Sequence, residues 1–259
     1  SLARETYDFT HTGDFKNTLQ EFYHTINFAQ VHFLLRNYAE AEKYSEEALR
    51  FNILDDGEKM NITDSILSQY RKPQAFLINA ASKYHLALNR NPEFLKNLLQ
   101  QTEEGIAILE QRKKVVNNHE DVTLLISENE ELLNFAEKIR LELYEITNDE
   151  IYLDKLIALH ESSIYSRIRS RLNLRDNVAF KHIPKTVIIK ENELKSKIVS
   201  SLNDSENGSI QPFFEASEKW DLFLDSLEQH FPKYYKMRYA TLEEPMNDLQ
   251  QKIPENTTV

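Results

Sequence analysis

Apolar side chains recur at alternating steps of four and three residues along most of this chain, and this spacing restricts the fold more than any other feature. The first series is Phe15, Leu19, Phe22, Ile26, Ala29 and Phe33. Residues three and four apart share one face of an α-helix, so the series predicts an amphipathic helix with one buried stripe. Similar series continue towards Tyr239, and only 4 Gly and 7 Pro interrupt the 259 residues. The sequence therefore predicts an all-α protein.

Short polar breaks between these series predict antiparallel helical hairpins. Arg36-Asn37 separates the first helix from a second one, which carries Ala41, either Tyr44 or Ser45, and Ala48 on one face. Two later segments resemble each other around their own breaks, namely Asn89–Leu98 and Thr147–Leu156. Recurrence of helix–turn–helix units is typical of a stacked solenoid, and this is the predicted architecture.

The later helices of the solenoid are predicted on the same grounds. Pro73 should kink or restart the third helix, because proline removes a helical hydrogen bond. This helix continues at helical spacing with Leu77, Ala81, Tyr84 and Leu88, and the next one is expected to face inward with Leu95, Leu98, Thr102, Ile106 and Leu109. After the polar break Asn117–Asp121, one long helix carries Leu125–Leu143. Its partner places His160 on an apolar face, as a core histidine, and runs on to Arg171.

Beyond Arg171 the pattern changes and predicts a separate, coiled-coil-like helical hairpin. Val187–Leu202 and Phe213–His230 have helical spacing, and the polar segment Asn203–Ser209 joins them. The apolar face of the second helix is expected to hold Phe214, Trp220, Phe223, Leu224 and Leu227. Phe231-Pro232 should end this helix.

Composition and charge exclude several classes of function. The net charge of −11 disfavours a general nucleic-acid binder, which is expected to be basic. The absence of cysteine excludes disulfides, thiolate zinc sites and cysteine nucleophiles, and it fits a reducing compartment. No apolar run reaches the roughly 18 residues that cross a bilayer, and no signal-peptide core is present. We therefore expect a cytoplasmic protein that binds neither nucleic acid nor membrane.

No pattern of catalytic or metal-binding residues is recognisable. The four glycines are scattered and cannot form a phosphate-binding loop or a nucleophile elbow. His24 and His32 lie two helical turns apart, too far to share a metal ion, and no HExxH spacing occurs. The sequence thus predicts no enzyme activity, no cofactor and no metal in this chain.

The first hairpin resembles a tetratricopeptide repeat over Asn27–Ala41 and the helix that follows. The small and aromatic positions of the repeat are taken by Ala29, Tyr38, Ala41 and Ala48. Small residues there let neighbouring helices approach closely. His32 and Ser45 stand where the repeat usually has aromatic residues.

The rest of the chain resembles the region before a CHAT domain, a caspase-like module found downstream of tetratricopeptide repeats. Ile151–Lys155 followed by His160–Arg167 looks like the last repeat, and Leu227–Ala240 looks like the connector. Thr241–Val259 resembles the lead-in to the first strand of that domain. The family's catalytic His and Cys lie in the CHAT domain, so no residue here inherits them.

The resemblance implies three parts. Residues 1–171 would be the repeats, residues 172–240 the linker and hairpin, and residues 241–259 the lead-in to a CHAT domain. The repeats would bind a protein or peptide and would regulate or target that domain in a bacterial cytoplasmic protein. The alternative is a free-standing scaffold that assembles partners and regulates no enzyme. An all-helical hydrolase is a third, weaker alternative.

Two candidate sites follow. In tetratricopeptide repeats the first helix of each hairpin lines a concave groove, which here would be lined by Tyr23, Asn27, Gln30, Phe33 and Leu34. An amide in such a groove can hold a peptide backbone, because it both donates and accepts hydrogen bonds. The competing interpretation is packing for the apolar members and solvation for the amides.

The second candidate is a basic patch at Arg167 and Arg171, four residues apart on one helical face. It would dock the downstream domain or an acidic partner. The competing interpretation is a solvated face paired with neighbouring acids.

Overall fold

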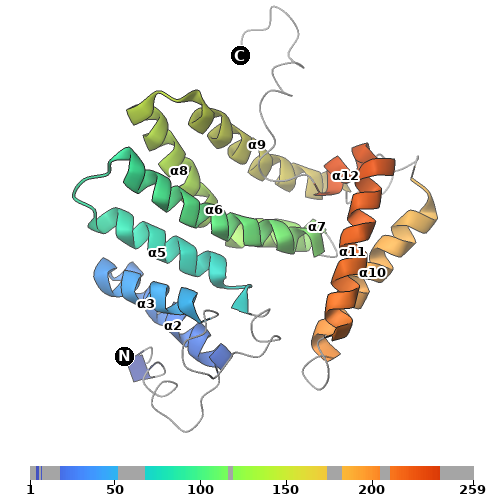
Figure 1. The fold of residues 1–259 in the computed structure, drawn as a ribbon, viewed down its shortest axis with the longest axis horizontal. Helices are drawn as coiled ribbons and strands as arrows, with labels where there is room; N and C mark the ends of the chain where they lie inside the picture. Colours follow the sequence, from blue (N-terminus) through green and yellow to red (C-terminus); the bar gives the residue numbers. More distant parts are fainter. Residues whose placement is uncertain are drawn as a thin grey trace, which may run out of the picture. The chain divides into compact units, whose positions relative to one another are not determined.

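The computed structural model describes most of the chain, and the described residues are 4, 5, 7, 18–51, 68–115, 119–173, 183–204 and 211–239. Every regular element within these ranges is an α-helix, and none is a strand (Figure 1). The all-α prediction is confirmed. Residues 241–259, which were expected to lead into a further domain, lie outside the described ranges.

The chain divides into two compact units, and each is described by itself. The first unit comprises Ser1–Leu109 and Asn129–Ile139, and the second comprises Glu110–Glu128 and Arg140–Val259. This division rests on compactness, whereas the predicted boundary at residue 171 rests on repeat content. That boundary therefore stays a prediction.

The first unit begins with the predicted hairpin of α2 (Thr18–Leu34) and α3 (Tyr38–Arg50). Phe22, Ile26 and Ala29 of the predicted stripe are fully buried. On α3 both Tyr44 and Ser45 are buried, so the two alternatives at this position are both correct. The apolar spacing thus predicts the faces by which these helices pack.

The turn between α2 and α3 closes with two backbone hydrogen bonds. Arg36 N donates to Phe33 O at 2.9 Å, and Asn37 N donates to His32 O at 2.9 Å. Arg36 has a φ of 60°, the left-handed conformation in which glycine is usual at this position of a helix end. A non-glycine residue there costs about 1 kcal/mol of conformational energy.

Helix α5 (Lys72–Leu86) packs against both helices of the hairpin. Pro73 lies at its first turn, so this proline starts the helix and does not kink it. Ala75 joins one apolar cluster with residues of α2 and α3, and Ile78 joins a second one. The three helices lie side by side (Figure 1).

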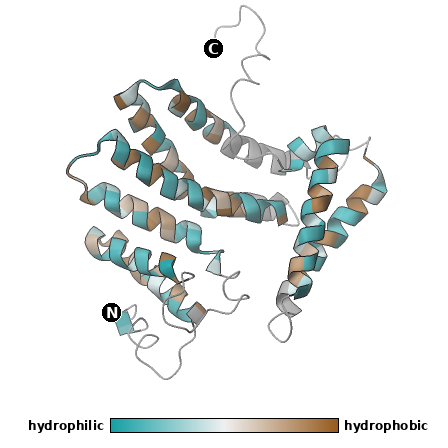
Figure 2. Cartoon of the chain, viewed as in Figure 1, coloured by the Kyte–Doolittle hydropathy of each residue, from teal (hydrophilic) through white to brown (hydrophobic). Residues whose placement is uncertain are grey.

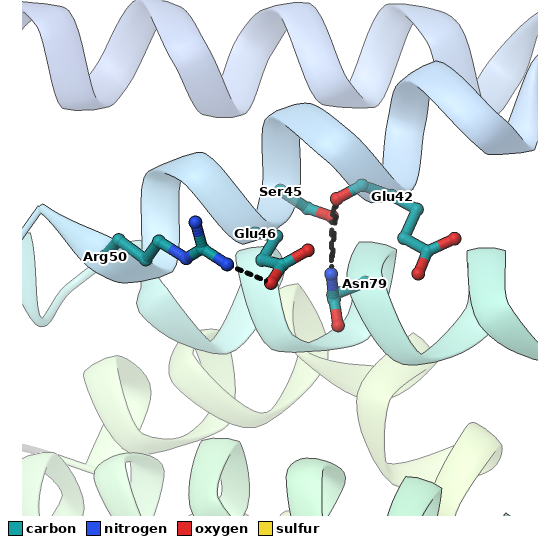
Figure 3. Close-up of polar contacts among 5 residues, drawn as sticks. All are labelled: Glu42, Ser45, Glu46, Arg50 and Asn79. Atoms are coloured by element: carbon teal, nitrogen blue, oxygen red, sulfur yellow. Dashed lines mark hydrogen bonds and ion pairs between the residues drawn. The ribbon is translucent and has the colours of Figure 1, made fainter.

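The α3–α5 contact contains a buried polar group that periodicity did not predict. Asn79 is 2% exposed, and its side-chain amide donates to Glu42 O and to Ser45 Oγ, at 3.2 Å each (Figure 3). Ser45 Oγ donates to the same carbonyl at 2.9 Å. Because buried donors left without a partner cost about 1–3 kcal/mol each, this contact favours one register of α5 on α3.

Helix α6 (Pro92–Val115) follows the predicted break and buries the predicted stripe. That stripe is Leu95, Leu98, Thr102, Ile106 and Leu109. Between these residues lies Gly105, where a Cβ atom would stand 3.0 Å from Leu132 Cδ2 and 3.3 Å from Phe76 Cβ. The glycine therefore permits close approach of α6 to α5 and α8.

Between α5 and α8, three details of the prediction are wrong. The single long helix is divided at Asn129 into α7 (His119–Glu128) and α8 (Glu130–Thr147), and the residues His119–Asp121 are helical. Asn129 O accepts the first backbone hydrogen bonds of α8, and Asn is a favoured residue at such a helix start. Leu88, predicted to share the α5 stripe, lies beyond the end of that helix and is exposed.

In the second unit, α9 (Glu150–Asn173) packs against α7. Arg140 on α8 is fully buried, and its guanidinium donates to Lys155 O on α9 at 3.0 Å. His160 is exposed, contrary to prediction, because the buried residues of this stretch are Ala158 and Leu159. The inward face of α9 is therefore rotated from the predicted one.

The predicted later hairpin is present as α10 (Lys185–Asp204) and α11 (Gln211–His230), which pack together. Apolar and polar residues alternate along α11 at helical spacing (Figure 2). Four of the five predicted core residues of α11 are buried, whereas Phe214 is 46% exposed. Pro232 ends α11 and starts α12 (Pro232–Tyr239), a helix that was not predicted.

A buried carboxylate joins α12 to α10. Glu191 is fully buried, and it accepts hydrogen bonds from the hydroxyls of Tyr234 and Tyr239, the latter at 2.6 Å. Arg238 Nε lies 3.0 Å from the carboxylate, and Lys195 Nζ lies 3.5 Å from it. A buried charge is tolerated only when its hydrogen-bonding capacity is used, and here four side chains of two helices use it.

The close approach at Gly105 can be tested by adding volume. Gly105→Val should lower the free energy of unfolding by at least about 2 kcal/mol, because overpacking outweighs any gain in helix propensity. Ala107→Val, at the exposed position two residues later, measures the cost of a β-branched residue in the same helix. Urea denaturation of both variants provides the comparison, and equal destabilisation would contradict the packing described.

The cluster around Glu191 should make stability depend on pH. Burial lowers the pKa of Lys195 from 10.5 to about 8. Between these values the unfolded chain retains a proton that the folded chain has released, so the free energy of unfolding should rise with pH. Above pH 10 the buried phenols of Tyr234 and Tyr239, whose pKa values burial raises, oppose this trend.

The measurement is urea unfolding between about pH 7 and about pH 9.5, followed by fluorescence of Trp220, the only tryptophan of the chain. Lys195→Met should flatten the rise. Lys197→Met, at an exposed position on the same helix, should leave it unchanged. An unaltered pH slope in Lys195→Met would show that Lys195 is not the titrating group.

Candidate functional site

Four of the five predicted groove residues form one stripe along α2. Tyr23, Asn27, Gln30 and Leu34 are separated by four, three and four residues, which places them on one face of the helix. Asn27 is exposed, Gln30 is partly exposed, and Leu34 is 72% exposed. The structure thus brings these four side chains together and leaves two amides accessible for a peptide backbone.

Tyr23 stands at the start of this stripe and is half-buried. Its ring centroid lies 5.7 Å from that of Phe22, and the guanidinium of Arg71 lies 5.8 Å from it. Arg71 directly precedes α5, so Tyr23 takes part in the α2–α5 contact. The packing interpretation therefore holds for part of this side chain.

Phe33, the fifth predicted residue, lies beside the stripe and belongs to an aromatic group at the end of the helices. Its ring centroid is 5.6 Å from that of Tyr38 and 6.3 Å from that of His85. The rings of Tyr38 and His85 stack with centroids 4.3 Å apart and planes 9° apart. This group joins the end of α2, the start of α3 and the end of α5.

Tyr84, also in the first unit, contacts the aromatic group through His85. It is buried, and its ring contacts those of His85 and Phe135 edge to face. The Arg90 guanidinium lies 3.8 Å from the ring centroid of Tyr84, and Lys138 Nζ lies 4.2 Å from it. Arg90 also donates to the Tyr84 hydroxyl at 3.1 Å and to the Tyr84 carbonyl at 3.2 Å. Two cations are thus held at this end of the unit.

Partial burial and three nearby cations both act on the His85 imidazole. Burial is the largest cause that lowers the pKa of the His85 imidazole, and the charges of Lys138, Arg90 and Arg36 lower it further. These cations come from α8 and from the turns after α5 and α2. Segments far apart in sequence therefore place three positively charged side chains near the exposed ring of His85.

Exposed leucines accompany these cations. Leu34 and Leu35 are each 72% exposed at the end of α2, and Leu88 is fully exposed just after α5. We define the turn-end patch as the set Leu34, Leu35, Arg36, Tyr38, His85, Leu88, Arg90 and Lys138. The patch combines apolar and positively charged groups beside the amide stripe of α2.

The second predicted site is placed only by its helix. Arg167 and Arg171 lie four residues apart in α9, but their side chains are outside the described part of the structure. This basic docking patch remains a prediction.

Among the described residues, no group of three or more His, Cys, Asp or Glu side chains could hold a metal ion. None of the described helices combines the length and apolar character needed to cross a membrane.

Sequence reasoning found the α2 stripe but missed most of the turn-end patch. Periodicity marks Phe33 because it continues an apolar series. It gives no signal for His85, Arg90 or Lys138, which come together only when α5 folds against the first hairpin and α8 folds against α5. The one local signal was Arg36, a non-glycine residue at the end of a helix.

Comparison of the chain with family models, with curated proteins and with solved structures finds no match.

Proposed function

We propose that this chain is a protein- or peptide-binding helical-repeat module that uses the α2 stripe as part of its binding face. The observation that carries the proposal is the packing of α5 across both α2 and α3. This packing resembles that of successive tetratricopeptide repeats. It uses one face of α2 and leaves Asn27, Gln30 and Leu34 accessible.

The chemistry of the stripe suits an extended peptide. Amide side chains offer both a donor and an acceptor to a peptide backbone, whereas Leu34 offers an apolar contact to a side chain. Because these residues contribute little to the core of the hairpin, binding need not disturb the fold.

The resemblance to the region before CHAT domains extends the proposal. In that case the module regulates or targets a caspase-like domain C-terminal to it, and any protease activity resides there. The alternative is a free-standing scaffold that assembles protein partners without regulating an enzyme. The coding sequence beyond Val259 separates the two: the first requires a strand-rich α/β segment with a His and a later Cys.

The binding face can be tested by removing both amides. Peptides should be selected from a random display library on the intact protein, and their affinities should then be measured for Asn27→Ala/Gln30→Ala. We expect a loss of about tenfold, since each net hydrogen bond contributes about 0.5–1.5 kcal/mol. The melting temperature should change little, because Asn27 is exposed and Gln30 is only partly buried.

The matched control is Asn97→Ala/Gln100→Ala. These residues are exposed on α6 with the same amide types and the same three-residue spacing. The control should bind as the parent does. Failure to select any peptide, or full retention of binding by the α2 double variant, would reject the α2 stripe as the site.

A further inference from the structure

The turn-end patch has a chemistry that indicates its partner. We infer that it binds an acidic peptide segment of the partner protein, one that carries apolar side chains between its carboxylates. This inference rests on the proposed function and specifies the class of peptide that the module takes. The α2 stripe would contact the peptide backbone, and the turn-end patch would select the side chains.

Charge complementarity is the first argument. The chain has a net charge of −11, so a random surface region is expected to be acidic. At the turn-end patch, however, Arg36, Arg90 and Lys138 all act on His85. Such a local concentration of cations favours carboxylates and disfavours basic peptides.

Accessible apolar surface at the same place is the second argument. Leu34 and Leu35 directly precede Arg36, Leu88 lies two residues before Arg90, and all three leucines are strongly exposed. Exposed apolar groups surrounded by polar ones are typical of protein interaction sites. Carboxylates alone would leave these leucines in water, so a peptide with both kinds of side chain fits the patch better.

The third argument is that aromatic rings hold the side chains of the patch in place. The His85 ring lies flat on Tyr38, and Tyr84 carries Arg90 and Lys138 on its ring. These contacts hold the aromatic and cationic groups in position before a ligand arrives. A surface arranged in advance loses less conformational entropy on binding.

The backbone of Arg36 is the fourth argument. Glycine fits the left-handed conformation of this helix end without strain, yet the position holds a bulky cation with a φ of 60°. Its charge also disfavours the protonated form of the His85 imidazole. The backbone conformation of Arg36 thus opposes local stability, as expected where a functional side chain is favoured over glycine.

A glycine at position 36 should therefore improve folding while it weakens binding. Arg36→Gly should raise the melting temperature, because glycine adopts a φ of 60° without strain. The same variant should bind an acidic peptide about two- to fivefold more weakly, the range expected for one exposed charge pair. Misfolding cannot explain a loss of binding in a more stable protein.

The probe is a short fluorescein-labelled peptide of Asp-Leu-Glu-Phe repeats, with a counterpart that has Lys at every acidic position. Fluorescence anisotropy on the intact protein should show binding of the acidic peptide, weakened by salt, and no binding of the basic one. Leu34→Ser/Leu35→Ser should weaken binding by about tenfold or more, through loss of apolar contact.

Two further readouts separate a binding role from a structural one. Asn148 has a φ of 54° at the α8–α9 turn, so Asn148→Gly relieves a similar backbone conformation outside the patch. It should raise the melting temperature slightly and leave peptide affinity unchanged.

The His85 imidazole faces Arg36, Arg90, Lys138 and the phenols of Tyr38 and Tyr84. Its pKa, followed by NMR, should rise when the acidic peptide binds.

Equal binding of the acidic and basic peptides, or unchanged affinity in Arg36→Gly, would overturn the inference. The proposed function would survive that result if library-selected peptides still depend on Asn27 and Gln30. The α2 stripe would be rejected separately if those amides proved dispensable while acidic peptides still required Arg36.

Discussion

The contact of α2, α3 and α5 across small side chains is the constraint on which the first unit depends. Ala29, Ala41, Ala48 and Ala75 are all fully buried at these contacts. Helices can approach to about 8 Å only where such residues meet, and larger ones would separate them. The same approach brings Asn79 within reach of α3 and His85 within reach of Tyr38. Core packing therefore also creates the exposed patch.

Stability and the proposed recognition depend on different residues of the same helices. On α2, Phe22 and Ile26 fill the core, whereas Asn27, Gln30 and Leu34 remain accessible. The turn after α2 shows the conflict between these demands, because Arg36 occupies a conformation that suits glycine. In the second unit the polar groups serve cohesion instead, since Glu191 is enclosed by its partners.

Local periodicity was sufficient to predict the all-α class, the two hairpins and most of the buried stripes. It failed where contacts between residues far apart in sequence determine the helix boundaries and the inward faces. The division at Asn129 and the outward position of His160 depend on how α7, α8 and α9 face their neighbours. Helix α12 lacks a clear apolar period, and its inward tyrosines are retained by Glu191, which lies far away in sequence. Of the candidate site, the α2 stripe was predictable, but the patch around His85 was not.

The central claim is that partner recognition occurs on the α2 stripe and the adjoining turn-end patch. Backbone amide chemical shifts of the isotope-labelled chain, recorded with and without a library-selected peptide, test it most directly. We expect the large changes in chemical shift to cluster between Tyr23 and Tyr38 and between Tyr84 and Arg90. Few chemical shifts should change in α10, α11 and α12. Large shifts confined to α10, α11 and α12 would contradict it.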